Sequence, residues 1–487
     1  MRKWLNAACL AAGMATTVLA QQPAALPPPN EQVVQYYRAL MSAGGTQAVI
    51  QAVSQAVLEA MKQGPMSPAT AQQTLASVPA AANAPAAASV PTILPKTWAD
   101  AITLKGDLRF REELIQDDSK IDKTKNGGKG DTYTRDRERI RARVGLEAKL
   151  TDDVKAVVRL STDEAGTIGG GGDPISGNQT LGAGDSKKGI YLDLAYLDWN
   201  LFGEGASELH GLFGKMNNPF ITMNDDLVWD PDLTPEGIGV QGRLDLSPVT
   251  LFGNAGYFWL QERNSRDPVS LLGGQGAARV EFIPEIALTV GAGLYSFQNV
   301  QGADVTDYSY DAAYQQMLAT SKIATNYPSG YGNTVVKYIG KDGTPGAKWK
   351  YGYNVFQPFA LLETYPTVFG RVLPVSFFGQ HVENLAVDAY NTGYMYGMAL
   401  GKAKNPGTFE VGASYAKLEK DATLGLWTDS DRWGGGTDGQ GGKFYAKYQI
   451  FKGLQAGITY YNDDKVISDP KKTADYSRWQ FDLLGSF

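Results

Sequence analysis

From residue 101 to residue 487 the sequence repeats one pattern: short segments of alternating apolar and polar residues, joined by connections that are alternately short and long. In AITLKGDLRF, for example, the apolar residues share one face of an extended strand and the charged residues share the other. Sixteen such segments are predicted, at 101–113, 133–149, 153–163, 190–200, 208–215, 237–246, 249–260, 275–283, 286–298, 353–363, 367–379, 392–402, 408–418, 441–451, 454–464 and 476–487. The pattern predicts an all-β fold.

The lengths of the connections indicate which all-β fold this is. Short ones include Pro284-Glu285 and Lys452-Gly453, whereas 164–189, 216–236, 299–352 and 419–440 are long and polar or glycine-rich. A soluble sandwich has no reason to alternate in this way, but an outer-membrane barrel has short periplasmic turns and long external loops. We therefore expect a transmembrane antiparallel β-barrel of about sixteen strands. A hairpin within TVVKYIGKDGTPGAKWKYGYN leaves eighteen strands as the alternative.

The end of the sequence, YSRWQFDLLGSF, favours the same fold. Trp479, Phe481, Leu483 and Phe487 fall on one face of a strand and polar residues fall on the other, with Leu484 as an exception. A terminal phenylalanine preceded by alternating apolar residues resembles the C-terminal signal of bacterial outer-membrane barrels. We expect these four residues to form such an assembly signal, which the barrel-assembly machinery would recognise.

The first twenty residues are typical of an export signal peptide. Arg2 and Lys3 supply a positive start, an apolar centre follows, and the small residue Ala20 precedes a predicted cleavage site at Gln21. The only cysteine, Cys9, lies inside this signal. The mature chain is therefore expected to contain no disulfide, no thiolate metal site and no cysteine nucleophile.

Residues 21–98 are rich in Ala, Gln and Pro and precede the predicted barrel segment 99–487. The stretch EQVVQYYRALMSAGGTQAVIQAVSQAVLEAMKQG has apolar residues at helical spacing, and the stretch that follows has the composition of a linker. We expect a partly helical periplasmic extension. Two interpretations of it remain open: a disordered tether with a transient helix, or a docked helical element that makes periplasmic contacts.

Composition and motifs argue against several classes of protein. Removal of Arg2 and Lys3 with the signal peptide changes the formal net charge from −6 to −8, which argues against nucleic-acid binding. His210 and His381 are the only histidines, and neither GxSxG nor HExxH occurs, so no enzymatic activity and no cofactor are expected. The aspartates of DSDRWGGGTDG leave calcium as a minor alternative, although their spacing departs from that of an EF-hand loop.

Several stretches are also similar to a known family. GDLRFREE, RDRERIRARVGLEAKLTDDVKAVVRLST, YLDLAYLDW, GLFGKMNNPF and LVWDPDLTPEGIGVQG resemble the bacterial putative porin family of Gram-negative outer membranes. The resemblance covers about 101–487, is densest in the first half of the barrel and leaves 21–98 outside. It implies a channel for small hydrophilic solutes in the cell outer membrane, and it supplies no substrate.

The stretch RDRERIRAR places an arginine at every second position: Arg135, Arg137, Arg139, Arg141 and Arg143. In a barrel strand this face points to lipid or to the lumen, and an arginine at the bilayer midplane costs about 2–4 kcal/mol. We therefore expect this arginine ladder to line a water-filled lumen. Basic residues of the same parity on neighbouring strands extend the wall: Arg109, Arg111, Lys155 and Arg159.

The third long connection carries five acidic residues: Asp225, Asp226, Asp230, Asp232 and Glu236. In general diffusion porins the third external loop folds into the barrel and faces a basic wall, and this connection has the same ordinal position. We expect a constriction in which these carboxylates oppose the arginine ladder. Two alternatives remain: the arginines brace the wall by pairing with Asp107, Glu147 and other lumenal carboxylates, or the five acids form a solvated surface.

The expected function is therefore that of an outer-membrane porin, through which small hydrophilic solutes or ions diffuse. The alternative is a barrel that does not transport and acts as an adhesin or a structural anchor through the long loop 299–352. Expected partners are outer-membrane lipid, the barrel-assembly machinery and small solutes, and analogy with porins of this size adds a homotrimer.

Overall fold

The computed structural model describes residues 98–122, 131–164, 172–223, 225–263, 267–305, 327–341, 343–368 and 370–487. The predicted signal peptide and all but the last residue of the predicted extension 21–98 lie outside the described residues. The elements are η1 (Trp98–Ala101), β1 (Ile102–Asp122), β2 (Asp131–Lys149), β3 (Val154–Asp163), β4 (Gln179–Thr180), β5 (Gly189–Glu204), β6 (Ser207–Lys215), β7 (Glu236–Asp245), β8 (Val249–Gln261), β9 (Val269–Ile283), β10 (Ile286–Gln298), η3 (Gly330–Gly332), β11 (Val335–Ile339), β12 (Pro345–Trp349), β13 (Tyr353–Thr364), β14 (Thr367–Val368), β15 (Arg371–Val372), β16 (Val375–Asn384), β17 (Thr392–Gly401), β18 (Phe409–Leu418), η4 (Gly425–Trp427), η5 (Arg432–Gly434), β19 (Gly439–Phe451), β20 (Leu454–Lys465) and β21 (Ala474–Ser486). None of the helices in these ranges is both long enough and apolar enough to cross a membrane.

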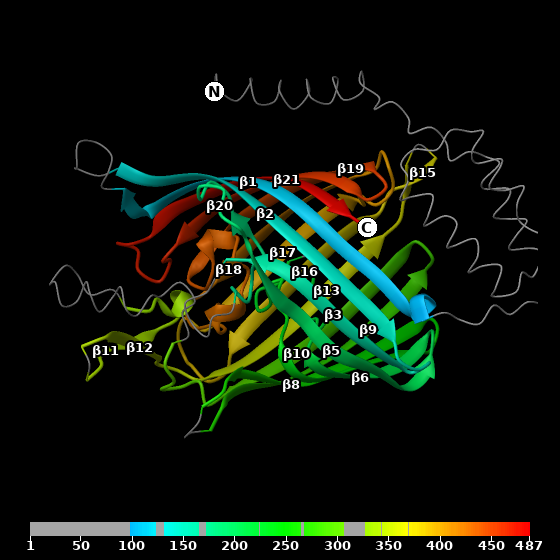
Figure 1. Ribbon diagram of the computed structural model, residues 1–487, viewed down its shortest axis with the longest axis horizontal. Helices are drawn as coiled ribbons and strands as arrows, with labels where there is room; N and C mark the ends of the chain where they lie inside the picture. Colours follow the sequence, from blue (N-terminus) through cyan, green and yellow to red (C-terminus); the bar gives the residue numbers. More distant parts are fainter. Residues whose placement is uncertain are drawn as a thin grey trace, which may run out of the picture. The chain divides into compact units, whose positions relative to one another are not determined.

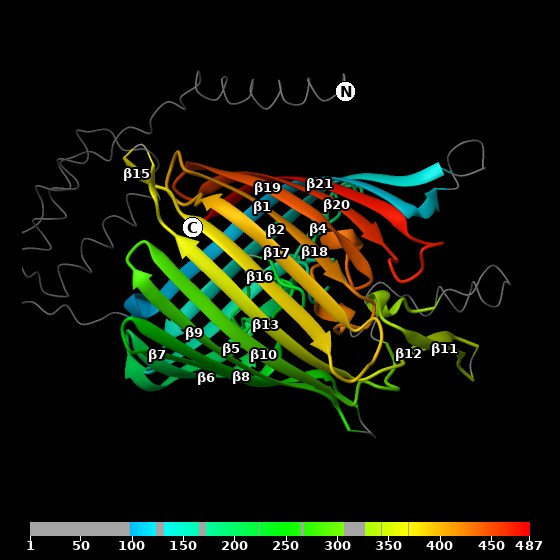
Figure 2. The ribbon, with the colours of Figure 1, turned by 180° about the vertical axis from the view of Figure 1, so that it is seen from behind.

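The strands form a closed antiparallel barrel (Figures 1 and 2), and the predicted fold class is confirmed. Within the described ranges the main sheet has seventeen strands, of which sixteen form the wall and the two-residue β4 pairs beside β3 on β2. β1 pairs with β21 from Asp107↔Ser486 to Asp117↔Tyr476, which closes the sheet on itself. Closure is required because an open edge in lipid would leave backbone N–H and C=O groups unsatisfied.

The alternative of eighteen strands is wrong. The segments expected to supply two more wall strands form β11 and β12, which pair with each other in a separate two-stranded sheet. β10 instead pairs with β13 along its whole length, from Ile286↔Thr364 to Phe297↔Tyr353, so no free edge is left between these two strands. The hairpin lies at the end of the barrel where the long connections gather (Figure 1).

Three predicted strands have the largest errors in their bounds, and one of them is β9, which begins at Val269 rather than at 275. β1 extends to Asp122 rather than ending at 113, with irregular pairing between Asp117 and Ile121. The segment predicted at 367–379 is divided: β14 and β15 form a small hairpin of their own, and the wall strand β16 begins only at Val375. Pro374 immediately precedes it and has no amide hydrogen to donate to the ladder. The connection between β13 and β16 is therefore longer than the predicted Thr364-Tyr365-Pro366.

The alternation in the sequence becomes an outer and an inner face. On β1, Leu108 is 58% exposed and Phe110 is 46% exposed on the outside, whereas Arg111 and Glu113 are buried on the inside. A slip of one residue would turn every charged side chain toward lipid, so the two faces fix the register. At the short-turn end, Gly453 joins β19 to β20 with a φ of 81°, a conformation that favours glycine.

The interior of the barrel is not polar throughout. Inward-facing apolar residues of β8 to β18 form one buried cluster: Phe258, Leu271, Tyr295, Phe297, Tyr353, Val355, Phe359, Phe378, Val382, Met395, Ala416 and Leu418. Apolar residues of the β6–β7 loop (216–235) and of the β18–β19 loop (419–438) belong to the same cluster. Two long connections are therefore packed against one half of the wall, and the charged half is formed by β1 to β3 and β19 to β21.

Candidate functional site

The pairing of β1 with β2 places arginines opposite one another on the inner face. Arg109 is in register with Arg141, and Arg111 is in register with Arg139. Like charges directly across a strand pair are destabilising. The wall is therefore stable only where carboxylates lie among the arginines.

Two carboxylates of β1 do so. Asp107 lies 3.2 Å from Nη2 of Arg141 and 2.7 Å from Nε of Arg143. Glu113, which is fully buried, accepts a hydrogen bond of 2.6 Å from Nε of Arg137. Part of the predicted ladder is thus paired within the wall, as the bracing interpretation requires.

Two other predicted basic residues pair with acids of neighbouring strands. Arg111 donates two hydrogen bonds to Asp482 of β21, of 2.6 Å from Nε and 2.7 Å from Nη2. Nε of Arg159 lies 2.5 Å from Asp193 of β5. The two-point geometry at Arg111 is the stronger arrangement, because a guanidinium and a carboxylate match in shape.

Two further predicted residues of the wall lie toward its ends. Arg135 is exposed near the long-loop end of β2, and Lys155 is half-buried near the short-turn end of β3. Glu147, expected to pair with an arginine, instead lies 2.6 Å from Nζ of Lys105 in an exposed pair. The ladder is therefore concentrated between Arg137 and Arg143.

The β6–β7 loop lies inside the barrel. Phe220, Leu227 and Trp229 of this loop are buried in the apolar cluster. The ring of Trp229 packs edge-on against Tyr295 of β10, with centroids 4.9 Å apart, and lies 5.8 Å from the ring of Trp427 in the β18–β19 loop. Burial of these large apolar side chains holds the loop against the wall and fixes where its acids lie.

One of the five predicted loop acids contacts the ladder. Asp232 lies 2.9 Å from Nη1 of Arg141 and 3.1 Å from Nη1 of Arg143. The expectation that all five oppose the ladder needs correction, because the loop turns its other acids in different directions. Glu236 is the first residue of β7 and pairs with Lys215 at 3.1 Å.

Asp225 points toward β19 rather than β2. It lies 2.5 Å from Nζ of Lys443 on β19 and 3.0 Å from Nη2 of Arg432 in the β18–β19 loop. Burial opposes the charged form of Asp225, but Lys443 and Arg432 outweigh it and hold the pKa of this carboxyl well below its usual range. Asp225 is therefore an anionic link between the two loops and the wall.

Asp226 has no cationic side chain within 4.0 Å among the described residues. It accepts hydrogen bonds from the backbone N–H groups of Val228 and Trp229, at 2.8 and 3.1 Å, and from Nε2 of Gln357. Burial raises the pKa of Asp226 to about 7, and the hydrogen bonds offset only part of that effect. This carboxyl acts in the turn of the loop and not in the constriction.

Asp230 joins the two inserted loops. Its carboxylate accepts the N–H groups of Asp232, at 2.8 Å, and of Ser430, at 3.0 Å, and its own N–H donates to the carbonyl of Trp427 at 2.7 Å. Burial, followed by repulsion from Asp429, raises the pKa of Asp230.

The β18–β19 loop is the part of the site that the sequence did not predict. Asp431 of this loop lies 2.9 Å from Nη1 of Arg478 and 3.4 Å from Nη1 of Arg111. One signal for its burial is present in the sequence, because Trp427 and Trp433 are large apolar residues in a connection expected to be external and polar. The calcium alternative for this stretch has no support in the described part of the chain, where no group of three or more His, Cys, Asp or Glu is placed to hold a metal ion.

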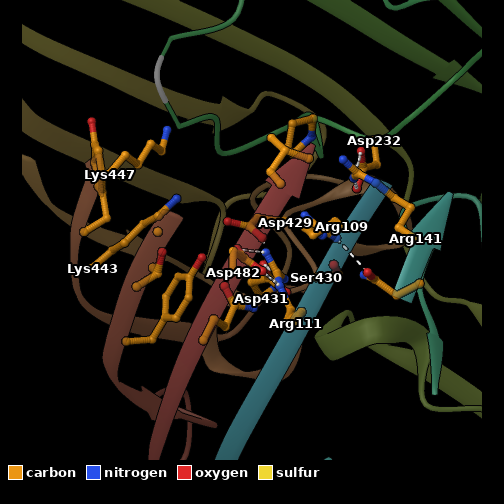
Figure 3. Close-up of a pocket in the computed structure, with 18 of the residues that line it drawn as sticks. Arg109, Arg111, Arg141, Asp232, Asp429, Ser430, Asp431, Lys443, Lys447 and Asp482 are labelled. Atoms are coloured by element: carbon orange, nitrogen blue, oxygen red, sulfur yellow. Dashed lines mark hydrogen bonds and ion pairs between the residues drawn. The ribbon is translucent and has the colours of Figure 1, made fainter. Parts of the chain in front are cut away.

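The charged half of the lumen contains a cavity of about 380 Å³ (Figure 3). Lys443 and Lys447 of β19 line one side, Arg109 and Arg111 of β1 line the other, and the tip of the β18–β19 loop lies between them. A second cavity of about 460 Å³ lies against β3, β5 and β6, and Asp232 lines both. The contact of Asp232 with the ladder therefore lies between these two cavities of the lumen.

The sequence model of the family described as Putative porin matches residues 42–368. The chain belongs to this porin family. The family and the barrel place the protein in the bacterial outer membrane as a channel-type barrel. The match begins at residue 42, so the expectation that 21–98 lies outside the resemblance is wrong for residues 42–98.

Several solved structures are similar to this porin at low sequence identity. OprB of Pseudomonas putida in its high-pH structure is 11% identical, with 80% of this chain and 94% of that chain covered and a TM-score of 0.47. OmpF of Salmonella typhi in complex with daunomycin is 9% identical, with 80% and 99% covered and a TM-score of 0.43. The outer membrane channel DcaP of Acinetobacter baumannii is 14% identical, with 79% and 97% covered and a TM-score of 0.39. A comparison with curated proteins finds no match.

Proposed function

We propose that this porin lets small hydrophilic solutes or ions diffuse across the outer membrane, past a constriction between the arginine ladder and the two inserted loops. The observation that carries the proposal is the position of Asp232, a loop carboxylate within 3.1 Å of both Arg141 and Arg143 inside the barrel. A loop that folds into the lumen and contacts β2 narrows the path and places charges of both signs beside it.

The charges at this position would act on solutes electrostatically. Basic side chains of β1 and β2 lie on one side, and carboxylates at the tips of the inserted loops lie on the other. Because such charges are screened less in a narrow lumen than in bulk water, they orient dipolar solutes and discriminate between ions. The function is that of a channel without catalysis.

Ion selectivity in planar lipid bilayers tests this proposal. Arg141→Gln removes a positive charge from the constriction, so the reversal potential in a KCl gradient should move toward cation selectivity. Asp232→Asn removes a negative charge and should move it toward anion selectivity. Glu285→Gln, at an exposed turn between β9 and β10, is the matched control and should leave the reversal potential unchanged. Equal reversal potentials for all four proteins would contradict the proposed constriction.

The same recordings separate the channel from its alternative. A barrel that serves as an adhesin or structural anchor would give no steady KCl current after insertion into the bilayer. A stable, reproducible single-channel current supports diffusion through the lumen.

We further propose that residues 1–20 are a cleaved signal peptide and that residues 21–98 form a partly helical periplasmic extension. Mass spectrometry of the protein from outer membranes should find Gln21 as its first residue; a chain that still begins at Met1 would contradict the first part. We also propose a homotrimer, which native mass spectrometry in detergent tests directly.

The proposed assembly signal consists of Trp479, Phe481, Leu483 and Phe487. Trp479, Leu483 and Phe487 are exposed on the outside of the barrel, where an assembly factor can reach them before lipid does. Phe487 also exchanges two backbone hydrogen bonds of 3.1 Å with Gly106, at the closing pair of strands.

A further inference from the structure

The charged side chains that line the cavity in Figure 3 are mostly paired. Arg111 pairs with Asp482 and Asp431, and Arg141 pairs with Asp232. On the other side of the cavity, Lys443 pairs with Asp225 and Lys447 pairs with Glu410. Three charged lining residues have no partner of opposite charge within 4.0 Å among the described residues: Arg109, Asp230 and Asp429.

Asp230 is not available to a solute. It is 4% exposed, and both of its carboxylate oxygens already accept backbone N–H groups. The hydrogen bonds by which Asp230 joins the two inserted loops therefore explain why this carboxyl is present without a partner of opposite charge.

Arg109 is different, because its guanidinium faces the cavity with most of its donors unused. Its one hydrogen bond to a described side chain is donated by Nη2 to Oδ1 of Asn178 at 2.7 Å. Nε of Arg109 is buried without a partner among the described residues. A half-buried guanidinium without a counter-charge within 4.0 Å is costly, so this position favours an anion that arrives from the lumen.

Asp429 offers the opposite charge on the same cavity. It is half-buried, and Oδ1 accepts the N–H of Asp431 at 2.8 Å while Oδ2 has no hydrogen-bond partner among the described residues. It comes from the β18–β19 loop, whereas Arg109 comes from the wall strand β1 (Figure 3). The two unpaired charges thus belong to different parts of the structure and line one space.

We propose that this cavity is a transient binding site for small zwitterions, the class that includes free amino acids, with the solute carboxylate at Arg109 and the solute ammonium at Asp429. The volume of about 380 Å³ lies at the small end of ligand sites, which occupy about 300–1,000 Å³, and suits a solute of this size. A zwitterion supplies both missing counter-charges and brings no net charge into the lumen. The inference rests on the proposed function, because the solute must enter through the channel.

The test is a titration of the single-channel KCl current with solutes of different charge. Glycine should lower the current in a saturable manner, and acetamide, which is of similar size and carries no charge, should leave it unchanged. The same titration with 4-aminobutyrate, whose two charges are farther apart, indicates which separation between carboxylate and ammonium fits Arg109 and Asp429. Arg109→Gln and Asp429→Asn should each raise the half-effective glycine concentration by about tenfold, because each removes one charge-assisted contact.

Controls and contrary outcomes separate this inference from the proposed function. Arg371→Gln and Asp388→Asn remove the same charges at exposed positions outside the lumen and should leave the glycine titration unchanged. Folding of every variant is checked by its KCl current and by its heat-dependent migration in gels. If acetate or methylammonium alone reproduces the effect, or if no zwitterion acts while KCl is conducted, the zwitterion site is wrong and the channel remains. If KCl is not conducted, the proposed function itself fails.

Discussion

At the scale of the residue, Glu113 holds the inner wall together because several arginines share its one buried carboxylate. Nε of Arg137 lies 2.6 Å from it, and Arg478 of β21 also donates to it. Arg111 and Arg139 come within 3.6 and 3.9 Å. A single acid therefore offsets the repulsion between basic side chains of three neighbouring strands.

We expect Glu113→Gln to lower the free energy of unfolding by about 3–5 kcal/mol, because it leaves buried arginines without their counter-charge. Glu112→Gln is the matched control: it is the adjacent residue, points to the outer face and should change the stability by about 0.5 kcal/mol or less. Denaturant unfolding of both variants in lipid vesicles measures the difference. Equal losses for the two would show that Glu113 has no special role.

A second expectation at this scale concerns pH. The pKa of Asp226 is raised from 3.8 to about 7 by burial, so the folded state keeps the proton that the unfolded chain has already lost. Its contribution to stability is therefore fully present below about pH 4 and is lost as the pH rises through about 7. Asp226→Asn imitates the neutral carboxyl, so its stability relative to the unchanged protein should increase between pH 5 and pH 8. Thermal unfolding of both proteins at pH 5 and pH 8 measures this change. A difference in stability that is the same at both pH values would contradict it.

The direction of the ladder could be predicted from the sequence, but its partners could not. Parity and the cost of arginine in lipid are local, and they predict an inward direction for Arg139 and Arg141, which are buried. The pairing of Arg111 with Asp482 joins residues at opposite ends of the barrel sequence. It depends on closure of the sheet, which no short stretch of sequence encodes.

At the scale of the element, the lumen is shaped by two loops that meet each other. The contacts of Asp230 with Trp427 and Ser430 connect the β6–β7 loop to the β18–β19 loop. Neither loop depends on its own secondary structure for its position. Each is held by apolar burial against the wall and by hydrogen bonds to the other.

We therefore expect Asp230→Ala to loosen the contact between these loops, because the N–H groups of Asp232 and Ser430 lose their acceptor. The single-channel current should become noisier and larger on average. Asp388→Ala, at an exposed position between β16 and β17, is the control and should behave as the unchanged protein. A quiet current of unchanged size in Asp230→Ala would show that packing alone holds the loops.

Strands and loops differ in how far the sequence predicts them. Period-two alternation identified every wall strand, because each has one face in lipid and one inside. The path of a loop leaves no such periodic signal. The same long connection carries Asp225 to β19 and Asp232 to β2, and the buried side chain of Trp229, which lies between them in the sequence, helps to hold this division.

At the scale of the whole molecule, the outer surface of the barrel is an apolar band that must match the thickness of the membrane. Leu108 lies on the outer face in the half of β1 nearer the short-turn end. Gln116 lies on the same face toward the long-loop end. Two positions on one face of one strand therefore sample different depths.

Leu108→Arg should lower the free energy of unfolding in lipid vesicles by about 2–4 kcal/mol, and Gln116→Arg by about 0–1 kcal/mol, because the cost of a cation depends on depth. Equilibrium unfolding in vesicles of defined chain length measures both. Similar losses of unfolding free energy at the two positions would show that Leu108 does not lie near the membrane midplane.

The pairing of β1 with β21 has a consequence for biosynthesis. Asp107 meets Ser486 across the seam, so this edge of β1 has no partner until β21, which follows all other described strands in the sequence, has been synthesised. Until β21 arrives, the sheet has two open edges that can join with other chains. A chain that lacks β21 keeps both of these edges unpaired, so the seam can close only a barrel in which β1 and β21 are both present.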